Sequence, residues 1–246
     1  MDRAVQINVD QVSVKYTMDR TGIKSMKEYV VSLCTGRLQL DTFSALKEVS
    51  FSVKAGEVFG IIGKNGAGKS TLLKVISGIL KPSKGTVVVK GRVIPMLELG
   101  SGFDQDLSGY ENIFLNGAIL GYSKAFLREH CQEIIDFSEL GDFVYAPIRT
   151  YSSGMMMRLA FSVAAVVLPD VLIVDEILAV GDASFQEKSR RRMMELMGGG
   201  TTVLMVSHDI SQIKSMCDRV AWLDHGKVVT VGPADEVCGQ YERWVE

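Results

Sequence analysis

The clearest chemistry in the chain lies in a short glycine-rich stretch that reads Gly63-Lys64-Asn65-Gly66-Ala67-Gly68-Lys69-Ser70. Its glycines leave room for a phosphate group, and its successive backbone N–H groups, together with the start of the next helix, can donate hydrogen bonds to phosphate oxygens. Lys69 adds a positive charge, and the Ser70 hydroxyl can ligate Mg²⁺. We therefore predict that a nucleoside triphosphate is bound by Gly63, Asn65, Gly66, Ala67, Gly68, Lys69, Ser70 and Thr71.

The segments on both sides of this stretch have the form that a phosphate-binding loop requires. Residues 57–62 read as a buried strand, and residues 70–77 carry apolar residues at helical spacing before Gly78 ends the helix. This order of strand, loop and helix favours a phosphate-binding loop over the alternative, a glycine turn that binds nothing.

Two further groups of polar residues follow apolar runs that we expect to be buried strands. Residues 171–174 lead into Asp175 and Glu176, and residues 201–206 are followed after one residue by His208. Because parallel sheets place their chemistry at the carboxyl ends of strands, we expect Asp175 to hold Mg²⁺ through water and Glu176 to accept a proton from an attacking water. The alternative for the two carboxylates is a solvated strand end. His208 can hydrogen-bond a γ-phosphate, although a single histidine is more often structural.

Two other candidate contacts lie far from the loop in the sequence. Residues 150–154 form a polar turn before a helix, so the hydroxyls of Ser152 and Ser153 either cap the helix or help its start to bind a phosphate. Tyr16 ends a strand predicted over residues 5–16, where its ring either packs in the core or stacks on an adenine. These residues, taken by themselves, leave both choices open.

The composition limits the classes of protein to which the chain can belong. Its 246 residues are 47% hydrophobic, enough for a full buried core, and the formal net charge of -2 gives no general attraction to nucleic acid. Cys34, Cys131, Cys217 and Cys238 are far apart and fit neither a zinc ribbon nor a disulfide framework, so we expect them to be reduced. The most apolar helix-like run, residues 159–168, is shorter than the roughly 20 residues that span a bilayer. A membrane role would therefore require a partner.

The remaining patterns predict the elements that position these residues. Strands are expected over residues 86–89 and 92–95, joined through Lys90 and Gly91, as antiparallel neighbours of the strand before the phosphate loop. Helical spacing dominates from about residue 100 to residue 165, which predicts an inserted helical subdomain.

Two amphipathic or charged helices have open interpretations. Within residues 17–44, helical spacing places Met26, Tyr29, Val30 and Leu33 on one face, so this helix either packs on its own domain or meets the membrane or a membrane partner. The basic cluster from Lys188 to Arg192 either faces solvent or contacts anionic lipid or a partner.

The order of these motifs resembles the ATPase subunit of an ABC transporter. The resemblance covers nearly the whole chain: the phosphate loop, a signature-like motif from Tyr151 to Met155, the strand that ends at Glu176, the loop that ends at Asp182, and His208. In that family two copies close head to tail around two ATP molecules. The resemblance therefore implies a homodimer in which each site contains residues of both chains.

The resemblance also implies roles for the residues of one copy. Lys69 and the loop amides hold the β- and γ-phosphates, while Ser70 and Asp175 serve Mg²⁺. Glu176 activates water, and His208 steadies the γ-phosphate.

Other roles implied by the resemblance lie outside the phosphate loop. Ser152 and Gly154 of the opposite copy, with Ser153 between them, cap the γ-phosphate, and Asp182 links the two sites. Tyr16 occupies the position at which the family stacks adenine.

Two departures from the family pattern affect specific contacts. The usual signature Leu-Ser-Gly-Gly-Gln is replaced at Tyr151, Ser153 and Met155, so its final Gln has no counterpart here. Where the family has a Gln near Mg²⁺ and the membrane subunit, Glu98 is the candidate replacement and Gln105 the weaker alternative, and a carboxylate is not equivalent to an amide.

These departures and the insertion at residues 17–44 resemble the ATPases of polysaccharide exporters for O-antigen, capsule or teichoic acid. We therefore expect one α/β domain over residues 1–246, a P-loop NTPase of the ABC type with a mostly parallel core sheet, an antiparallel β subdomain and an inserted helical subdomain. Its expected cofactors are ATP and Mg²⁺. Because the sequence ends at Glu246, without room for the carbohydrate-binding domain of some members, we expect polymer recognition to belong mostly to the membrane subunit.

The expected function is ATP hydrolysis that drives export of a polysaccharide or lipid-linked glycan. Its partners would be a second copy and a pair of integral membrane permease subunits, with no nucleic acid. The chain would then lie peripherally at the cytoplasmic face of the inner membrane. The alternatives are another lipid or drug exporter and, more remotely, a soluble ABC ATPase of translation or DNA repair.

Overall fold

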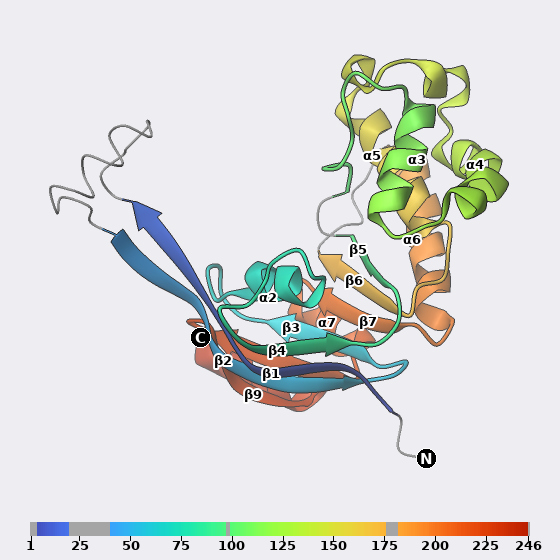
Figure 1. Cartoon of the computed structure of the whole chain (residues 1–246). Coiled ribbons are helices and arrows are strands. Elements are labelled where there is room, and N and C mark those ends of the chain that lie inside the picture. Colours follow the sequence, from blue (N-terminus) through green and yellow to red (C-terminus); the bar gives the residue numbers. More distant parts are fainter. Residues whose placement is uncertain (1–3, 20–39, 97–98, 176–181, 246) are drawn as a thin grey trace, which may run out of the picture.

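Two β-sheets form the centre of the molecule (Figure 1). The computed structural model describes residues 4–19, 40–96, 99–175 and 182–245. The larger sheet has six strands in the order β5-β6-β7-β3-β8-β9, in which β9 runs antiparallel to β8 and the other neighbours run parallel. Its strands are β3 (Val58–Ile62), β5 (Val93–Pro95), β6 (Val171–Asp175), β7 (Thr202–Val206), β8 (Arg219–Asp224) and β9 (Lys227–Pro233).

The smaller sheet is antiparallel and has three strands in the order β2-β1-β4. These are β1 (Val5–Asp19), β2 (Leu40–Lys54) and β4 (Lys84–Val89). The first two strands are longer than predicted and extend into residues 17–44, because residues of that segment continue the ladder, with Thr17 opposite Thr42. Positive φ angles at Gln11 and Glu48 accompany the irregular register between the two strands.

The prediction for residues 86–95 was wrong about the neighbours of these strands. β4 pairs with β1, β5 pairs with β6 in the other sheet, and β3 lies between the parallel strands β7 and β8. The chain changes sheet at Gly91, where φ is 86° and the next amide, Arg92 N, donates a 2.7 Å hydrogen bond to Asp170. Short apolar runs do not specify their partner strands, so the sequence pattern could not separate these possibilities.

Helices cover the sheets and form a group to one side of them (Figure 1). The helix α2 (Lys69–Ile76) follows β3 directly, and α7 (Ile210–Met216), which the sequence analysis did not identify, follows β7. The side group consists of α3 (Gly109–Ile119), α4 (Lys124–Ser138) and α5 (Ser153–Ala165), with the short 3₁₀ turns η1 (Gly141–Tyr145) and η2 (Ile148–Thr150). The remaining helices are α6 (Ala183–Gly198) and α8 (Ala234–Val245).

Polar side chains set the starts of α3 and α4. Ser108 and Glu111 form a reciprocal capping box at α3, and Ser123 accepts a hydrogen bond from Phe126 N at α4. Capping of this kind satisfies the free N–H groups of the first turn and fixes where each helix begins.

The core holds the strand that leads into the phosphate loop. Phe51 of β2 stacks on Phe59 of β3 with ring centroids 5.2 Å apart, which joins the two sheets. On the opposite face of β3, Ile62 lies in a second buried cluster with Ile213 of α7 and Val237 of α8. β3 is therefore covered on both sides, as its apolar sequence requires.

Several sequence predictions lie outside the described residues. They are the amphipathic helix that contains Met26 and Leu33 and, as single residues, Cys34, Glu98 and Glu176. Within the described ranges, the structure contains no helix that combines the length and the apolar composition needed to cross a bilayer.

Candidate functional site

Three neighbouring parallel strands end at the same edge of the larger sheet. β6, β7 and β3 lie side by side, and their carboxyl ends lead to Asp175, to Ser207 and His208, and to the phosphate loop. Asp175 itself pairs with Val206 in the β6–β7 ladder. Sequence segments more than 100 residues apart therefore meet at one edge, where parallel sheets bind ligands.

The glycines of the phosphate loop are required by its close packing. Gly63 has a φ of 149°, and a Cβ atom there would lie 2.2 Å from the carbonyl oxygen of Leu223 on β8. Gly68 has a φ of 107°, and its Cβ would lie 2.8 Å from the carbonyl oxygen of Ala45 on β2. The loop is thus wedged between strands of both sheets at positions that only glycine accepts.

Lys69 lies across the phosphate loop. Its buried ammonium group donates hydrogen bonds of 2.6 Å to Gly63 O and 3.2 Å to Lys64 O. α2 begins at this residue, and its N-cap, Gly68, makes no side-chain capping bond to the N–H groups of the first turn. A lysine ammonium and the first-turn N–H groups of a helix at one point form an anion-binding arrangement that fits a triphosphate.

One cavity of about 400 Å³ brings most of the predicted nucleotide-site residues together. It is lined by Tyr16, Phe43, Ala45, Asn65, Gly66, Gly68, Lys69, Ser70, Thr71, Asp175, Val206 and His208. Gly63 and Ala67 are buried residues of the loop and do not line this cavity, and Ala67 N donates to Lys64 O over 3.1 Å. Ser70 and Asp175 supply a hydroxyl and a carboxylate oxygen in the same cavity, which are ligands of the kind that Mg²⁺ prefers.

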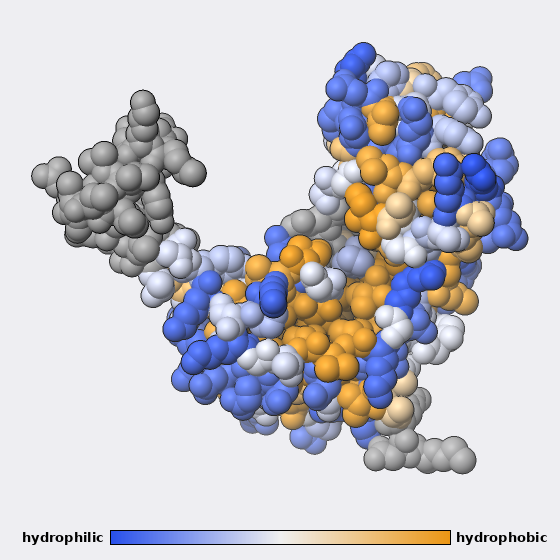
Figure 2. Space-filling view, in the orientation of Figure 1, coloured by the Kyte–Doolittle hydropathy of each residue, from blue (hydrophilic) through white to orange (hydrophobic). Residues whose placement is uncertain are grey.

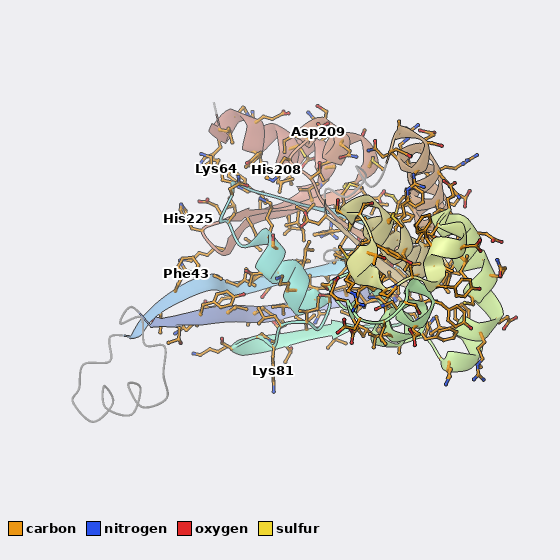
Figure 3. The ribbon with its side chains drawn as sticks, turned by 90° about the horizontal axis from the view of Figure 1, so that it is seen from above. Phe43, Lys64, Lys81, His208, Asp209 and His225 are labelled. Carbon is orange, nitrogen blue, oxygen red and sulfur yellow. The ribbon has the colours of Figure 1, made fainter. Side chains whose placement is uncertain are left out.

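Phe43, Ala45 and Val206 line the cavity although the sequence did not predict them as site residues. Phe43 lies directly opposite Tyr16 in the β1–β2 ladder, and Figure 3 labels it on β2, with Lys64 on the phosphate loop and His208 after β7. The apolar residues Phe43, Ala45 and Leu46 are a signal for a strand, but the sequence pattern places residue 43 in the insertion at residues 17–44.

The signature-like residues line a different cavity, of about 650 Å³, at the start of α5. Ser152, Ser153 and Gly154 lie on its wall together with Asp182. Among the lining residues that the structure describes, none is shared with the cavity at the phosphate loop. Ser152 Oγ accepts a 3.2 Å hydrogen bond from Met155 N, so the capping interpretation of this serine is confirmed. Its hydroxyl is nevertheless exposed at the cavity wall.

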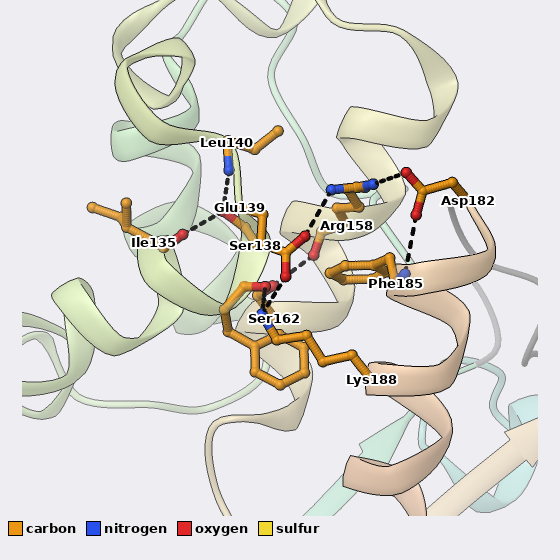
Figure 4. A network of polar contacts seen from close by, with 10 residues as sticks. Ile135, Ser138, Glu139, Leu140, Arg158, Ser162, Asp182, Phe185 and Lys188 are labelled. Atoms are coloured by element: carbon orange, nitrogen blue, oxygen red, sulfur yellow. Dashed lines mark hydrogen bonds and ion pairs between the residues drawn. The ribbon is translucent and has the colours of Figure 1, made fainter.

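A network of ion pairs joins α5 to the start of α6 (Figure 4). Arg158 of α5 contacts Glu139 at 3.2 Å and Asp182 at 2.6 Å, and its guanidinium group lies 4.9 Å from the centre of the Phe185 ring. Asp182 caps α6 by accepting a 3.0 Å hydrogen bond from Phe185 N. This hydrogen bond, with the charge of Arg158, lowers the pKa of Asp182 below its ordinary value of 3.8.

The basic cluster on α6 is largely neutralised within the chain. Lys188 contacts Glu139 at 2.8 Å, Arg190 contacts Glu187 at 2.9 Å, and Arg192 contacts Glu195 at 3.0 Å. These contacts agree with the solvated-face interpretation rather than with a patch of free positive charge.

The unusual residue Tyr151 in the signature-like motif has a structural partner. Its hydroxyl donates a 2.7 Å hydrogen bond to Phe143 O of η1, and burial raises the pKa of this phenol. Tyr151 therefore anchors the turn that presents Ser152.

The fold and the loop geometry together define a P-loop nucleotide-binding protein. The family model described as ABC transporter matches residues 46–179. The chain is 43% identical over 243 residues to the O-antigen export system ATP-binding protein RfbB of Klebsiella pneumoniae, covering 96% of this chain and 97% of that protein. The chain therefore belongs to the family of ABC transporter ATP-binding proteins.

Longer relatives match over only part of their length. The RfbB protein of Myxococcus xanthus is 50% identical over 198 residues, which are 80% of this chain and 45% of that protein. The teichoic acids export ATP-binding protein TagH of Bacillus anthracis is 37% identical over 241 residues, which are 98% of this chain and 43% of that protein. The chain thus spans less than half of these two relatives.

Solved structures show the same fold. The ATP-binding subunit of an ABC transporter matches with a TM-score of 0.71 and 22% identity, covering 96% of this chain and 93% of that chain. A dimeric ATP-binding cassette in a post-hydrolysis state, bound to ADP and Pi, matches with a TM-score of 0.68 and 22% identity over 93% of this chain and 98% of that chain. The expected fold class, a P-loop NTPase of the ABC type, is confirmed.

Proposed function

We propose that this chain is the ATP-binding and ATP-hydrolysing subunit of an exporter for a polysaccharide or lipid-linked glycan. The observation that carries the proposal is the meeting of Lys69, Asp175 and His208 in one cavity of a chain that is 43% identical to an O-antigen export ATP-binding protein along 97% of its length. The teichoic acid exporters among the relatives support the same class of cargo.

The cavity residues suggest how ATP would be held. Lys69 and the N–H groups at the start of α2 would neutralise the β- and γ-phosphates, and His208 would donate a hydrogen bond to the γ-phosphate. Ser70 and Asp175 would hold Mg²⁺, which would neutralise developing phosphate charge. Tyr16 would stack on the base.

Hydrolysis would depend on the carboxylate that follows Asp175 in the chain. Glu176 would orient the attacking water and accept its proton, because it follows the strand end that supplies Asp175 to the cavity. This assignment rests on the sequence position of Glu176.

A second copy would complete the site. Ser152, Ser153 and Gly154 line a cavity of their own, which supports the proposal that the residues capping the γ-phosphate would come from another chain facing the phosphate loop. Asp182, on the wall of the same cavity, would link the two sites. In this arrangement residues 1–246 would act as one ABC ATPase domain, with about residues 100–165 as a helical subdomain.

An apolar groove supports docking of a membrane permease. Figure 2 shows hydrophobic residues gathered in the hollow between the sheets and the helices α3 to α5. A cavity of about 320 Å³ there is lined by Leu99 and Gly102, with Ile79 and Ile119 exposed to 54% and 62% at its sides. A helix of the permease in this groove would hold the chain at the cytoplasmic face of the membrane. Glu98, next to Leu99 in the sequence, would then replace the usual Gln between the nucleotide and the permease.

The catalytic part of the proposal is tested with Glu176→Gln. Loss of a general base lowers turnover by about 10²- to 10⁴-fold, whereas an amide of the same shape leaves ATP binding intact. We expect purified Glu176→Gln to bind ATP, to lose at least about 100-fold in ATP hydrolysis, and to accumulate as an ATP-bound dimer. Hydrolysis at the normal rate would refute the assigned role of Glu176.

The transport part is tested by deleting the gene in its native host and analysing the glycans that remain inside the cell. We expect lipid-linked polysaccharide to accumulate, and the wild-type gene, but not the Glu176→Gln gene, to restore export. Recovery of the purified protein with ribosomes or DNA, with no membrane partner and no retained glycan, would contradict a role in transport.

A further inference from the structure

Phe43 is an exposed aromatic ring at the edge of the nucleotide cavity. Phe43 is 55% exposed, and Tyr16, which lies directly opposite it in the β1–β2 ladder, is 36% exposed. Among the described residues, neither ring is part of the buried apolar clusters that form the core. Packing therefore gives no account of why two large rings lie at this position.

The geometry of β2 places Phe43 on the same side as the phosphate loop. Ala45 lines the cavity, and its carbonyl oxygen is the atom that a Cβ at Gly68 would meet at 2.8 Å, so β2 passes directly over the loop at this residue. Phe43 lies on the same strand and lines the same cavity, although the β1–β2 ladder skips Ala45. The ring therefore lies on the loop-facing side of β2.

The register of the two strands places the second ring beside the first. Side chains of directly opposite residues in an antiparallel ladder project from the same face with Cβ atoms about 5 Å apart. Tyr16 and Phe43 are such a pair, and both line the cavity that contains Lys69 and Ser70. A nucleotide whose phosphates lie on the loop would carry its base along β2 toward this pair.

We infer that Phe43 is a second base-binding residue, which forms with Tyr16 a two-ring platform for the base of the nucleotide. The inference rests on the nucleotide-binding function proposed above and extends it. Base-to-ring stacking needs only a π face, which Phe43 supplies without a hydrogen-bonding group. The phosphate loop then binds the triphosphate, and the two rings of the β1–β2 hairpin bind the base.

The test compares a ligand that has a base with one that lacks it. Calorimetric titration with Mg²⁺ and either the non-hydrolysable ATP analogue AMP-PNP or inorganic tripolyphosphate is done on the wild type, Phe43→Ala, Phe43→Trp and Tyr16→Ala. Val88→Ala is the matched control, because Val88 is an exposed apolar residue of the same sheet outside the cavity. Phe43→Leu serves as a second variant that keeps apolar bulk on the strand if Phe43→Ala does not fold.

Loss of one stacking contact weakens base binding about fivefold or more. We expect this loss for AMP-PNP in Phe43→Ala and Phe43→Leu, recovery in Phe43→Trp, no change in Val88→Ala, and unchanged tripolyphosphate affinity in every folded variant. The inference is overturned if Phe43→Ala binds AMP-PNP as the wild type does, or if it loses the two ligands equally. Unchanged AMP-PNP affinity with loss of ATP-dependent dimerisation would instead assign Phe43 to a protein contact.

Failure of the inference can be distinguished from failure of the proposed function. If the wild type bound neither AMP-PNP nor tripolyphosphate, nucleotide binding itself would be wrong. If the wild type bound both ligands and Phe43→Ala bound AMP-PNP with wild-type affinity, the phosphate loop would keep its assigned role. The base would then be bound by Tyr16 without Phe43.

Discussion

At the residue scale, the glycines of the phosphate loop differ in what they contribute. Gly63 and Gly68 have backbone atoms of β8 and β2 within 3 Å of the position a Cβ would take, whereas a Cβ at Gly66 would meet no atom of the described residues within 4 Å. All three have positive φ angles, so any other residue would be strained at each position. At Gly63 and Gly68 its Cβ would also clash with the backbone of a neighbouring strand. The loop is therefore held in shape by two glycines and left open at the third.

This difference predicts unequal effects of alanine in the loop. We expect Gly63→Ala, whose Cβ would lie 2.2 Å from Leu223 O, to lower the free energy of unfolding by about 2–4 kcal/mol. Gly66→Ala, with open space and a φ of 79°, is expected to cost only about 1 kcal/mol. Urea unfolding of both variants measures the two losses in the free energy of unfolding. Equal losses would show that the positive φ angle, and not the close packing at Gly63, is what requires glycine.

The second prediction at the residue scale concerns Lys69. Because its ammonium lies on the loop beside the first turn of α2, we expect Lys69→Ala to lose at least about tenfold in affinity for Mg²⁺-ATP, the value of one charge-assisted hydrogen bond. Lys81→Ala, in the exposed turn after α2, is the control and should bind normally. Equilibrium titration decides the question, and normal affinity in Lys69→Ala would contradict the proposed phosphate cradle.

At the element scale, Arg158 connects two helices that begin at site residues. α5 starts beside Ser152, and α6 starts at Asp182, which directly follows residues 176–181. The contacts of Arg158 with Glu139 and Asp182 hold these starts in a fixed relation. A movement of one helix start would therefore strain the other.

The lowered pKa of Asp182 makes this connection sensitive to acid. As the pH falls, the unfolded chain takes up the proton of this carboxylate first, so its contribution to stability is present above the ordinary value of 3.8 and is lost as the pH falls through the folded value. We expect the wild type to be more stable than Asp182→Asn at pH 7 and the two to converge as the pH falls below 3.8 and through the folded pKa of Asp182. Urea unfolding at several pH values tests this.

The control for this prediction is Asp142→Asn, an exposed carboxylate of η1 outside the network. It should not reproduce the pH-dependent difference. In Arg158→Met, the effect of Asp182→Asn should shrink but persist, because the hydrogen bond from Phe185 N remains. A difference between wild type and Asp182→Asn that is independent of pH would mean that Asp182 acts only through its shape.

The helices and strands also show why the sequence predicted where some elements lie in the chain but not which strands pair with each other. Helices such as α5 and strands such as β6 carry their own periodicity and caps, so their positions follow from local residues. The placement of β5 in the parallel sheet and of Phe43 on a paired strand depends on contacts with segments more than 20 residues away. Local patterns do not contain that information, which is why the neighbours of β3 and the second ring of the cavity were missed.

At the scale of the whole molecule, the residues predicted for one site lie on two surfaces. The loop that holds Lys69 follows β3 of the larger sheet, and the start of α5 belongs to the helical group beside the sheets (Figure 1). The sequence identified residues of both surfaces but gave no distance between them, because motif order along a chain does not specify spatial separation. The separation is the structural basis for the proposal that a second copy supplies Ser152 and Gly154.

Gly154 allows this proposal to be tested without disturbing the single chain. Among the described residues, a Cβ at Gly154 would have only Ser152 Oγ near it, at 3.8 Å. Gly154 lies in the first turn of α5, where a carboxylate is favourable. We expect Gly154→Asp to leave the free energy of unfolding unchanged or to raise it by about 0.5–1 kcal/mol. Its negative charge would face the γ-phosphate bound by the other copy, so ATP hydrolysis should fall at least about tenfold.

The decisive measurement is dimer formation in the Glu176→Gln background, by light scattering with and without ATP. Gly154→Asp should prevent the ATP-dependent dimer but leave ATP binding to the single chain unchanged, because its cavity is separate from the phosphate loop. Gly198→Asp, also a helical glycine with open space around it, should dimerise normally. If Gly154→Asp dimerised and hydrolysed ATP like the wild type, the start of α5 would not face the nucleotide of a second copy, and the two cavities would have to serve separate purposes.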